Sequence, residues 1–367
     1  MDNTRYMERA IELSLTSWGN VSPNPYVGAV IVKDDKIVGE GWHHQAGQPH
    51  AEIEALKVAG EAAKGSTLYV SLEPCCHHGK TPPCTEAIIK SGITKVVYAV
   101  DDANPLVAGK SKKILEDAGI EVISGVLEKI AREVNEIFFF NQERKMPFVA
   151  LKAATSLDGK MATSTRDSKW ITGEKAREKA HELRAAYDAI LIGSGTLNYD
   201  DPELTVRNGK YKGKNPIRIV VAGQALSLDL SAQIFETEKA PTWLIHSFKE
   251  IPTEWERLEN QGVKLIFVES DHGKVDLKKM LKSLWDMGIK SLFIEGGPKI
   301  HGEFLDKRLV QRLYLFQAPL LIGGEKAPTI WDGIGSNKVQ DGIKIEELKM
   351  DICGKDILVT GRLIGEV

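Results

Sequence analysis

The pattern of apolar and polar positions divides the first 145 residues into alternating helices and strands. Apolar residues recur at helical spacing over residues 5–15, and two short apolar runs, 27–33 and 36–41, flank a predicted hairpin turn at Asp34 and Asp35. The alternation then continues, with helices predicted at residues 50–63, 85–91 and 110–118 and strands at 67–72, 95–100 and 120–123. Such alternation is typical of a layered α/β domain.

A polar segment at residues 141–146, followed by Pro147, separates this series from a second one. In the second series, helices are predicted at residues 174–186, 275–287 and 300–305, and strands at 148–154, 189–192, 217–221, 242–245, 263–268, 292–294, 312–318 and 356–362. Each series has enough elements for a core of its own. The sequence therefore predicts two domains, residues 1–145 and 146–367, each built on an α/β sheet.

Composition and charge narrow the function classes. With 42% hydrophobic and 27% charged residues, the chain is typical of a globular protein. A formal net charge of -3 at pH 7 argues against nucleic acid as the main partner, because neutralising phosphates requires a basic surface. The N-terminal segment has no signal-peptide core, and no apolar run is long enough to cross a bilayer. We therefore expect a cytoplasmic protein that binds neither nucleic acid nor a membrane.

The strongest chemical signal is His50-Ala51-Glu52, followed by Cys75 and Cys84. In a reducing compartment, clustered cysteines favour a metal over a disulfide. One imidazole and two thiolates give three zinc ligands and leave a fourth position for water, as a catalytic zinc requires. Glu52 follows the histidine by two residues, near a predicted helix start, where it can take a proton from that water and pass it to a leaving amine.

Two other interpretations of this cluster remain open. A structural zinc site could close with Cys76, His77 or His78 as its fourth ligand, although such sites usually use Cys-x-x-Cys pairs and eight residues separate Cys75 from Cys84. Alternatively, the three side chains could be unrelated, with the thiols buried in the core and the histidine on the surface.

Two glycine-bearing turns each follow a predicted strand in the second half: Gly193-Ser194-Gly195-Thr196 and Glu295-Gly296-Gly297-Pro298. Such turns can simply end strands, but glycine also lets cofactor phosphates approach the backbone, and the second turn opens a helix whose free N–H groups favour a pyrophosphate. Another predicted strand ends at Ala222-Gly223, where many nicotinamide enzymes carry an acid that binds the ribose 2′-hydroxyl. The lack of an acid is compatible with a 2′-phosphate and hence with NADPH.

The first half resembles a known family. His-Ala-Glu followed by Pro-Cys and a second cysteine is similar to the signature of the cytidine deaminase superfamily, and CHHGKTPP between the cysteines, with Asn24-Pro25 and residues 27–29 upstream, resembles the riboflavin-biosynthesis deaminases. The resemblance implies a cytidine-deaminase-like α/β/α fold in which His50, Cys75 and Cys84 bind one zinc ion and Glu52 is the catalytic proton shuttle. It also implies substrate contacts from Asn24, His43, His77, Lys80, Asp102 and Asn104, any of which could instead be a surface or turn residue.

The order of motifs in the second half resembles the reductase half of the same bifunctional family, whose domain is similar to dihydrofolate reductase. This resemblance implies an NADPH site made by Ala154, Trp170, Thr172, Thr196, Asp200, Gly297, Pro298, Lys299, Ile300, His301, Gly302 and Glu303. It implies a site for the ribose phosphate of the substrate made by Ser168, Arg184, Leu204, Arg207 and Glu295. Lys152 is a candidate substrate contact at the reduction site, although a strand lysine at a domain boundary could also be simply solvated. Guanidinium groups suit phosphate because they bind it through two parallel hydrogen bonds, although each arginine could also form an ordinary surface ion pair.

The family resemblance implies two successive reactions on one phosphorylated pyrimidine. The first is a zinc-dependent deamination of 2,5-diamino-6-ribosylamino-4(3H)-pyrimidinone 5′-phosphate, and the second is the reduction of its ribosyl group to ribityl by NADPH. We expect a homo-oligomer whose partner is this small molecule. The alternatives are a tRNA or nucleoside deaminase with an appended nucleotide-binding module, and a zinc-stabilised binding protein without catalysis. The segment HHGKTPP offers little of the basic and aromatic character that nucleic acid would require.

Overall fold

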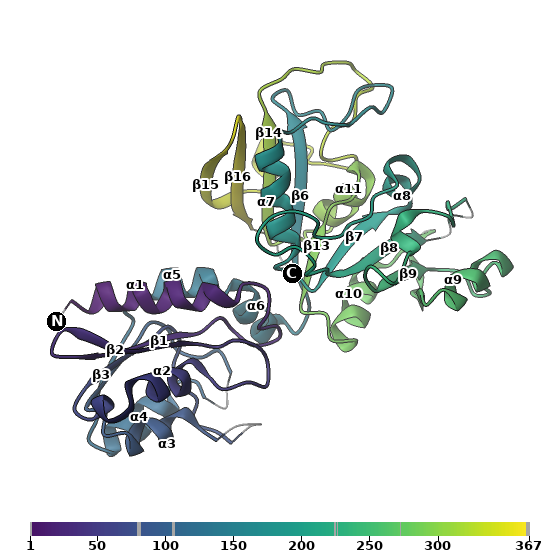
Figure 1. The fold of residues 1–367 in the computed structure, drawn as a ribbon. Helices are drawn as coiled ribbons and strands as arrows, with labels where there is room; N and C mark the ends of the chain where they lie inside the picture. The colour runs from purple at the N-terminus through teal and green to yellow at the C-terminus, as the bar shows by residue number, and fades with distance from the viewer. Residues whose placement is uncertain are drawn as a thin grey trace. The chain divides into compact units, whose positions relative to one another are not determined.

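The computed structural model describes residues 2–78, 82–104, 107–223, 225, 227–271 and 273–364. The chain divides into two compact units, Met1–Lys145 and Met146–Val367. Each unit has its own hydrophobic core around a β-sheet, so both are α/β units as the sequence predicts (Figure 1). No helix in the described ranges has both the length and the apolar character needed to cross a bilayer.

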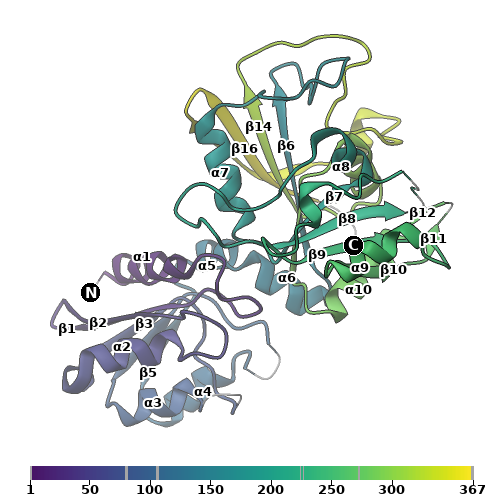
Figure 2. The same cartoon turned by 45° about the vertical axis from the view of Figure 1, so that its right-hand side comes forward.

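The first unit is a sheet between two layers of helices. The sheet has the order β2-β1-β3-β4-β5, in which β1 is antiparallel to both neighbours and β3, β4 and β5 are parallel. Helices α1 and α5 lie on one face and α2, α3 and α4 on the other (Figures 1 and 2). The bounds are α1 Asn3–Ser14, β1 Gly28–Lys33, β2 Lys36–Trp42, α2 Ala51–Ala59, β3 Thr67–Val70, α3 Cys84–Lys90, β4 Lys95–Tyr98, α4 Lys110–Asp117, β5 Glu121–Ser124, α5 Glu128–Val134 and α6 Glu136–Arg144, with 3-10 turns at Leu15–Ser17 and Gly60–Ala63.

Two glycines of β2 let α2 approach the sheet closely. A Cβ atom at Gly39 would lie 2.4 Å from the carbonyl oxygen of Ala55, and one at Gly41 would lie 2.4 Å from the amide nitrogen of Ala55 and 2.5 Å from the carbonyl oxygen of Ala51. The backbone of α2 therefore rests directly on β2, with no side chain between them. This contact sets the position of the first turn of α2 relative to the sheet.

The second unit is built on a nine-stranded sheet of order β10-β9-β8-β7-β13-β6-β14-β16-β15. The strands from β10 to β14 run parallel, and β16 and β15 are added antiparallel at one edge. The bounds are β6 Phe148–Ser156, α7 Glu174–Arg184, β7 Ala189–Gly193, α8 Ser194–Asp200, β8 Ile217–Gly223, β9 Thr242–His246, α9 Glu256–Asn260, β10 Lys264–Phe267, β11 Ser270–Asp271, β12 Lys274–Val275, α10 Leu277–Asp286, β13 Ser291–Ile294, α11 Pro298–Asp306, β14 Arg312–Ala318, β15 Ile345–Cys353 and β16 Asp356–Leu363, with 3-10 turns at Gln233–Phe235, Thr253–Trp255 and Val339–Asp341.

Side chains alternate between the two faces of the central strands. Val149 and Leu151 of β6 join the core that α10 and α11 cover, whereas Lys152 and Ala154 point to the other face. Because β7, β13 and β6 are adjacent and parallel, their carboxyl ends lie together at one end of the sheet. Ligands of open α/β sheets bind beside these carboxyl ends.

Several elements were not expected from the sequence. Helices α5 and α6 cover residues 128–144, so α6 occupies most of the polar segment 141–146, and α8 and β15 were also not predicted. In α6 the consecutive aromatic residues Phe138, Phe139 and Phe140 obscure the helical period. Every residue of β15 except Cys353 is exposed, so this strand has no buried face to produce an alternating pattern.

We predict that Gly41→Ala destabilises the first unit. The added Cβ would overlap the backbone of α2, and overpacking of this kind costs about 1–3 kcal/mol in the free energy of unfolding. Denaturant titration followed by circular dichroism measures the change. Gly195→Ala is the control, because its Cβ would meet nothing within 4 Å; equal destabilisation by the two variants would contradict the prediction.

Candidate functional site

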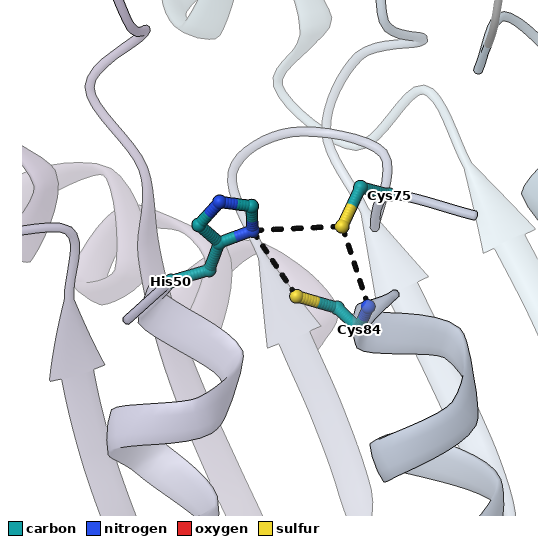
Figure 3. Close-up of side chains that lie close together, drawn as sticks. All are labelled: His50, Cys75 and Cys84. Atoms are coloured by element: carbon teal, nitrogen blue, oxygen red, sulfur yellow. Dashed lines mark hydrogen bonds between the residues drawn. The ribbon is translucent and has the colours of Figure 1, made fainter. Parts of the chain in front are cut away.

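Three side chains from separate segments converge at one end of the first sheet. His50 is the residue immediately before α2, Cys75 follows β3, and Cys84 is the first residue of α3. The Nδ1 atom of His50 lies 3.3 Å from Sγ of Cys84 and 3.5 Å from Sγ of Cys75. Figure 3 shows both sulfur atoms on the Nδ1 side of the imidazole. The amide of Cys84 also donates to Sγ of Cys75, at 3.3 Å.

This arrangement fits a tetrahedral zinc ion. With usual Zn–N and Zn–S bond lengths, a nitrogen and a sulfur ligand of one tetrahedral zinc ion lie about 3.6 Å apart. The two nitrogen–sulfur distances here are 3.3 and 3.5 Å, and the three ligand atoms all lie within 4.8 Å of one another. The donor set of one imidazole and two thiols also matches the preference of zinc.

Within the described ranges, Cys76, His77 and His78 do not belong to this metal-binding group. The imidazole of His78 instead faces Glu86, at 3.6 Å, and its side chain is largely exposed. The interpretation of a closed structural site with one of these residues as fourth ligand is therefore not supported. Three protein ligands leave one position of the tetrahedron for water or substrate.

Glu52 lies in the first turn of α2 and is buried. Its carboxyl group interacts with the Cys84 thiol, which places it beside the ligands without being one of them. Burial raises the pKa of Glu52 to about 7, and the charge of Cys75 adds to this increase. A carboxyl group with a pKa near neutrality can both accept and release a proton at physiological pH.

Asn24 and His43, two of the residues predicted to contact substrate, are joined to each other, and His43 lies beside the zinc ligand His50. The His43 ring meets the His50 ring edge-on, with 5.5 Å between centroids. Nδ1 of His43 lies 3.1 Å from the carbonyl oxygen of Pro49, so it carries the ring proton, and Nε2 accepts from Nδ2 of Asn24 at 3.0 Å. These bonds fix the orientation of the His43 ring and of the Asn24 amide.

Asp102 and His77 also lie near the cluster. Burial raises the pKa of Asp102 to about 6, and the charges of Glu73 and Cys75 add to the effect while that of His77 opposes it. The Asp102 carboxylate accepts from the amide of Asn104, at 2.8 Å. Lys80, also predicted to contact substrate, lies outside the described residues.

Sequence reasoning missed Glu73, which lies two residues before Cys75 and is almost fully buried. Its carboxylate accepts hydrogen bonds from the amides of Asp102, Gly109 and Ser111. These partners are backbone groups about 30 to 40 positions further along the chain, so no side-chain motif reveals the connection.

In the second unit, Glu295 gathers two basic side chains at the carboxyl end of β13. Nζ of Lys152, from β6, lies 3.3 Å from Oε2 of Glu295, and Arg184, the last residue of α7, donates from Nε and Nη2 to both carboxylate oxygens. Burial alone would raise the pKa of Glu295, but Arg184 and Lys152 outweigh it and lower the pKa to about 2. Glu295 therefore stays ionised at neutral pH.

The other residues expected around the ribose phosphate differ in accessibility. The Arg207 side chain is 47% exposed, and its Nη1 donates to Glu203 at 3.1 Å. Leu204 is buried in a left-handed backbone conformation, with φ of 52°. His181 was missed by the sequence reasoning, although it lies one helical turn before Arg184: its Nδ1 is 3.5 Å from Nη1 of Arg184 and 3.4 Å from the amide of Arg207.

The two glycine turns predicted for the cofactor lie side by side. They end the adjacent parallel strands β7 and β13, and a Cβ atom at Gly297 would lie 3.1 Å from Oγ1 of Thr196. Gly297 precedes α11, and no side chain caps its first turn, so its backbone N–H groups can meet an anion. Two side chains of α11 that were predicted to contact the cofactor, His301 and Glu303, are already engaged, the first with the carbonyl oxygen of Ile330 and the second with Lys274.

The remaining predicted cofactor residues lie on neighbouring segments. Ala154 is in β6, on the same face as Lys152. Trp170 is 69% exposed, and the Arg177 guanidinium lies over its ring, 4.7 Å from the centroid. The same arginine donates to the carbonyl oxygen of Thr172. Asp200 accepts weakly from Oγ of Ser168, at 3.4 Å.

Comparisons with known proteins cover both units. Residues 147–359 match the family model described as the RibD C-terminal domain, and residues 1–100 match that of the cytidine and deoxycytidylate deaminase zinc-binding region. The riboflavin biosynthesis protein RibD of Bacillus amyloliquefaciens is 43% identical over 355 residues, which is 97% of this chain and 95% of the relative.

Two solved structures also resemble the whole chain. Acinetobacter baumannii RibD has a TM-score of 0.86 at 36% identity and covers 99% of both chains. The diaminohydroxyphosphoribosylaminopyrimidine deaminase/5-amino-6-(5-phosphoribosylamino)uracil reductase of Thermotoga maritima has a TM-score of 0.86 at 37% identity, again over 99% of both chains.

We predict about one equivalent of zinc per chain, because the three ligands form one site. Cys84→Ser should lose most of this metal, since a serine hydroxyl replaces a thiolate ligand. Metal analysis of the purified protein measures the content, and Cys76→Ser is the matched control, because Cys76 lies outside the ligand group. Full zinc retention in Cys84→Ser would show that Cys84 is not a ligand.

Proposed function

The chain belongs to the RibD family of riboflavin biosynthesis proteins, and we propose that its two units act in succession on one phosphorylated pyrimidine. It is a bifunctional enzyme with a zinc-dependent deaminase activity and an NADPH-dependent reductase activity. Membership of this family argues against the alternative function, a tRNA or nucleoside deaminase with an appended nucleotide-binding module. We assign deamination to residues 1–145 and reduction to residues 146–367, in line with the two compact units.

The deaminase would act on the 2-amino group of 2,5-diamino-6-ribosylamino-4(3H)-pyrimidinone 5′-phosphate. His50, Cys75 and Cys84 would hold the zinc ion, which when bound would supply a hydroxide nucleophile at neutral pH. Glu52 is the proton shuttle: its pKa of about 7 lets it accept a proton and deliver it to the departing amine, which leaves as ammonia. The observation that carries this proposal is the buried Glu52 carboxyl beside a three-ligand cluster.

Substrate orientation in the deaminase would come from residues around the cluster. Asn24 and His43 are held by their mutual hydrogen bond, with His43 beside His50. Asp102 lies close enough to Cys75 and His77 for their charges to act on it, and it binds the amide of Asn104. We propose that these polar groups bind the pyrimidine and its ribose phosphate, together with Lys80.

The reductase would convert the ribosyl group to ribityl. NADPH supplies the hydride that reduces C1′ of the sugar. We propose that the cofactor lies along the carboxyl ends of β6, β7 and β13, with its pyrophosphate at the start of α11 and its other contacts from Ala154, Trp170, Thr172, Thr196 and Asp200.

The charged residues of the reductase would have separate roles. Lys152 would donate to the sugar oxygen as the ring opens, because ionised Glu295 holds its ammonium group at the edge of the sheet. Arg184 is bound to both oxygens of Glu295, so we assign it to orienting that carboxylate. Arg207, which is half exposed, is then the arginine available for the substrate phosphate, and we propose Ser168 and Leu204 as further contacts of the substrate.

We also propose a cytoplasmic homo-oligomer. A reducing compartment keeps Cys75 and Cys84 as thiols available to zinc. For assembly, the edge of the second sheet offers an apolar surface, on which Leu348, Met350 and Ile352 of β15 are each more than half exposed.

Incubating the purified protein with the diaminopyrimidine phosphate tests the function. Mass analysis should show the deaminated product without NADPH and the ribityl product with NADPH. An unchanged substrate under both conditions, with zinc bound, would contradict the proposal.

We predict that Glu52→Gln retains zinc but loses deamination by about two or more orders of magnitude, because glutamine keeps the size and cannot accept the proton. Reduction of the already deaminated substrate should remain close to that of the unaltered enzyme, since the two activities are assigned to separate units. Ammonia release and NADPH oxidation measure the two steps. Near-normal ammonia release would rule out Glu52 as the shuttle, and joint loss of both activities in a folded variant would indicate one shared site.

We predict that Arg207→Ala raises the substrate KM of the reductase by about ten- to a hundredfold, the range expected for loss of a charged hydrogen bond of about 1.5–3 kcal/mol. The KM for NADPH should change little, and Arg207→Lys should recover only part of the loss, because lysine lacks the planar fork. Steady-state kinetics with NADPH and NADH measures these constants. If Arg207 instead binds the 2′-phosphate, Arg207→Ala will weaken NADPH far more than NADH and leave the substrate KM unchanged.

A further inference from the structure

Glu73 connects the zinc-bearing loop to a distant segment of the deaminase. Its Oε2 atom accepts from the amides of Asp102, at 3.1 Å, and Gly109, at 3.0 Å, and its Oε1 atom accepts from the amide of Ser111, at 3.1 Å. The side chain is only 2% exposed. Three backbone donors thus converge on one buried carboxylate, which satisfies its charge away from water.

The three donor amides belong to two nearby stretches of the chain, one at Asp102 and the other at the start of α4. Asp102 precedes Asn104, and its carboxylate accepts from the Asn104 amide. Gly109 and Ser111 surround the start of α4, whose N-cap, Gly109, has no side chain to cap the helix. Glu73 therefore caps α4 from another part of the chain and at the same time holds Asp102.

The segment that contains Glu73 is also fixed to the segment that follows β4 and to α4, and it leads directly to a zinc ligand. The Glu73 amide donates to the carbonyl oxygen of Val100, at 2.9 Å, and the Ser111 hydroxyl donates to the carbonyl oxygen of Pro74. Cys75 follows directly. One short stretch, residues 73–75, thus carries both a zinc ligand and the anchor of the segment with Asp102 and Asn104.

From this geometry we infer that Glu73 is a positioning residue of the deaminase, which holds Asp102 and Asn104 at the zinc site so that they can bind the substrate. The inference rests on the proposed function, because it takes Asp102 and Asn104 as substrate contacts. It assigns Glu73 no contact with the substrate and no part in proton transfer. Its effect should appear in substrate binding and not in metal binding.

Only a carboxylate can accept all three hydrogen bonds, because both of its oxygen atoms are needed as acceptors. In Glu73→Gln one carboxylate oxygen becomes an NH₂ group, which cannot accept from an amide, while the other oxygen can still accept. The variant keeps the shape of the side chain but loses either the two bonds to Asp102 and Gly109 or the one to Ser111. The segment would then be held less firmly at the site.

We expect Glu73→Gln to raise the KM of deamination by roughly tenfold or more, with kcat changed less than about threefold. Zinc content and the reductase activity of the same full-length chain should equal those of the unaltered enzyme. Loss of zinc, or a fall in kcat at unchanged KM, would overturn the inference, because Glu73 would then support the metal site itself. The control is Asp2→Ala, which removes another carboxylate that caps a helix of this unit, α1, and should leave the KM unchanged.

A double-mutant cycle separates this inference from the proposed function. Asn104→Ala should raise the KM by itself, and its effect should not add to that of Glu73→Gln, because both act through the same segment. An Asn104→Ala variant with normal KM would refute the substrate role of the segment, which belongs to the proposed function. A normal KM in Glu73→Gln, or fully additive effects of the two substitutions, would refute the inferred role of Glu73 and leave the proposed function intact. If Glu73→Gln does not fold, Glu73→Asp gives the same decision, because it keeps the charge but shortens the reach to the three amides, and it should raise the KM by a few-fold at unchanged zinc content.

Discussion

The direct contact of α2 with two glycines of β2 determines the geometry of the deaminase site. His50 immediately precedes α2, and Glu52 lies in its first turn, so a shift of this helix would move a zinc ligand and the proposed proton shuttle together. Cys75 and Cys84 come from the end of β3 and the start of α3. The ligands can meet only if both helices begin at the same end of the sheet.

The reductase site depends on a buried carboxylate instead of a metal. Glu295 is held by Arg184 from α7 and by Lys152 from β6, so one ion cluster joins a helix to two adjacent parallel strands. Such a cluster contributes little net stability, because desolvating its charges opposes their attraction. It does fix the direction of the Lys152 ammonium group. The glycine turns at the ends of β7 and β13 then provide open backbone beside it.

The zinc site could be predicted from the sequence because its chemistry depends on rare residue types at short spacing. His50 and Glu52 are two residues apart, and Cys75 and Cys84 are nine positions apart, so the motif can be recognised in the sequence without knowledge of the fold. The central strands of both sheets were also predicted, since they are buried and strongly apolar. The family resemblance, confirmed by the comparisons, supplied what spacing alone could not: the reductase activity and its cofactor.

Strand β15 and the contacts of Glu73 and His181 escaped prediction for a related physical reason. Strand β15 forms by backbone pairing with β16 while its side chains stay exposed, and Glu73 binds backbone amides far along the chain. Neither interaction leaves a pattern of side-chain types. His181 is similar, because its partners are the Arg184 guanidinium and a backbone amide. Interactions in which the backbone is the partner must be read from the structure.

The two sites show how one residue type is adapted to two tasks. Glu52 and Glu295 are both buried carboxyl groups, and burial raises the pKa of each. At Glu52 the nearby Cys75 charge adds to burial, and the pKa rises to about 7, which suits a group that must gain and lose a proton. At Glu295 two basic side chains overcome burial and lower the pKa to about 2, which suits a group that must remain charged to hold its partners. Burial is the main cause of the raised pKa at Glu52, whereas at Glu295 two basic neighbours outweigh burial, so the balance between burial and neighbouring charge separates the two groups.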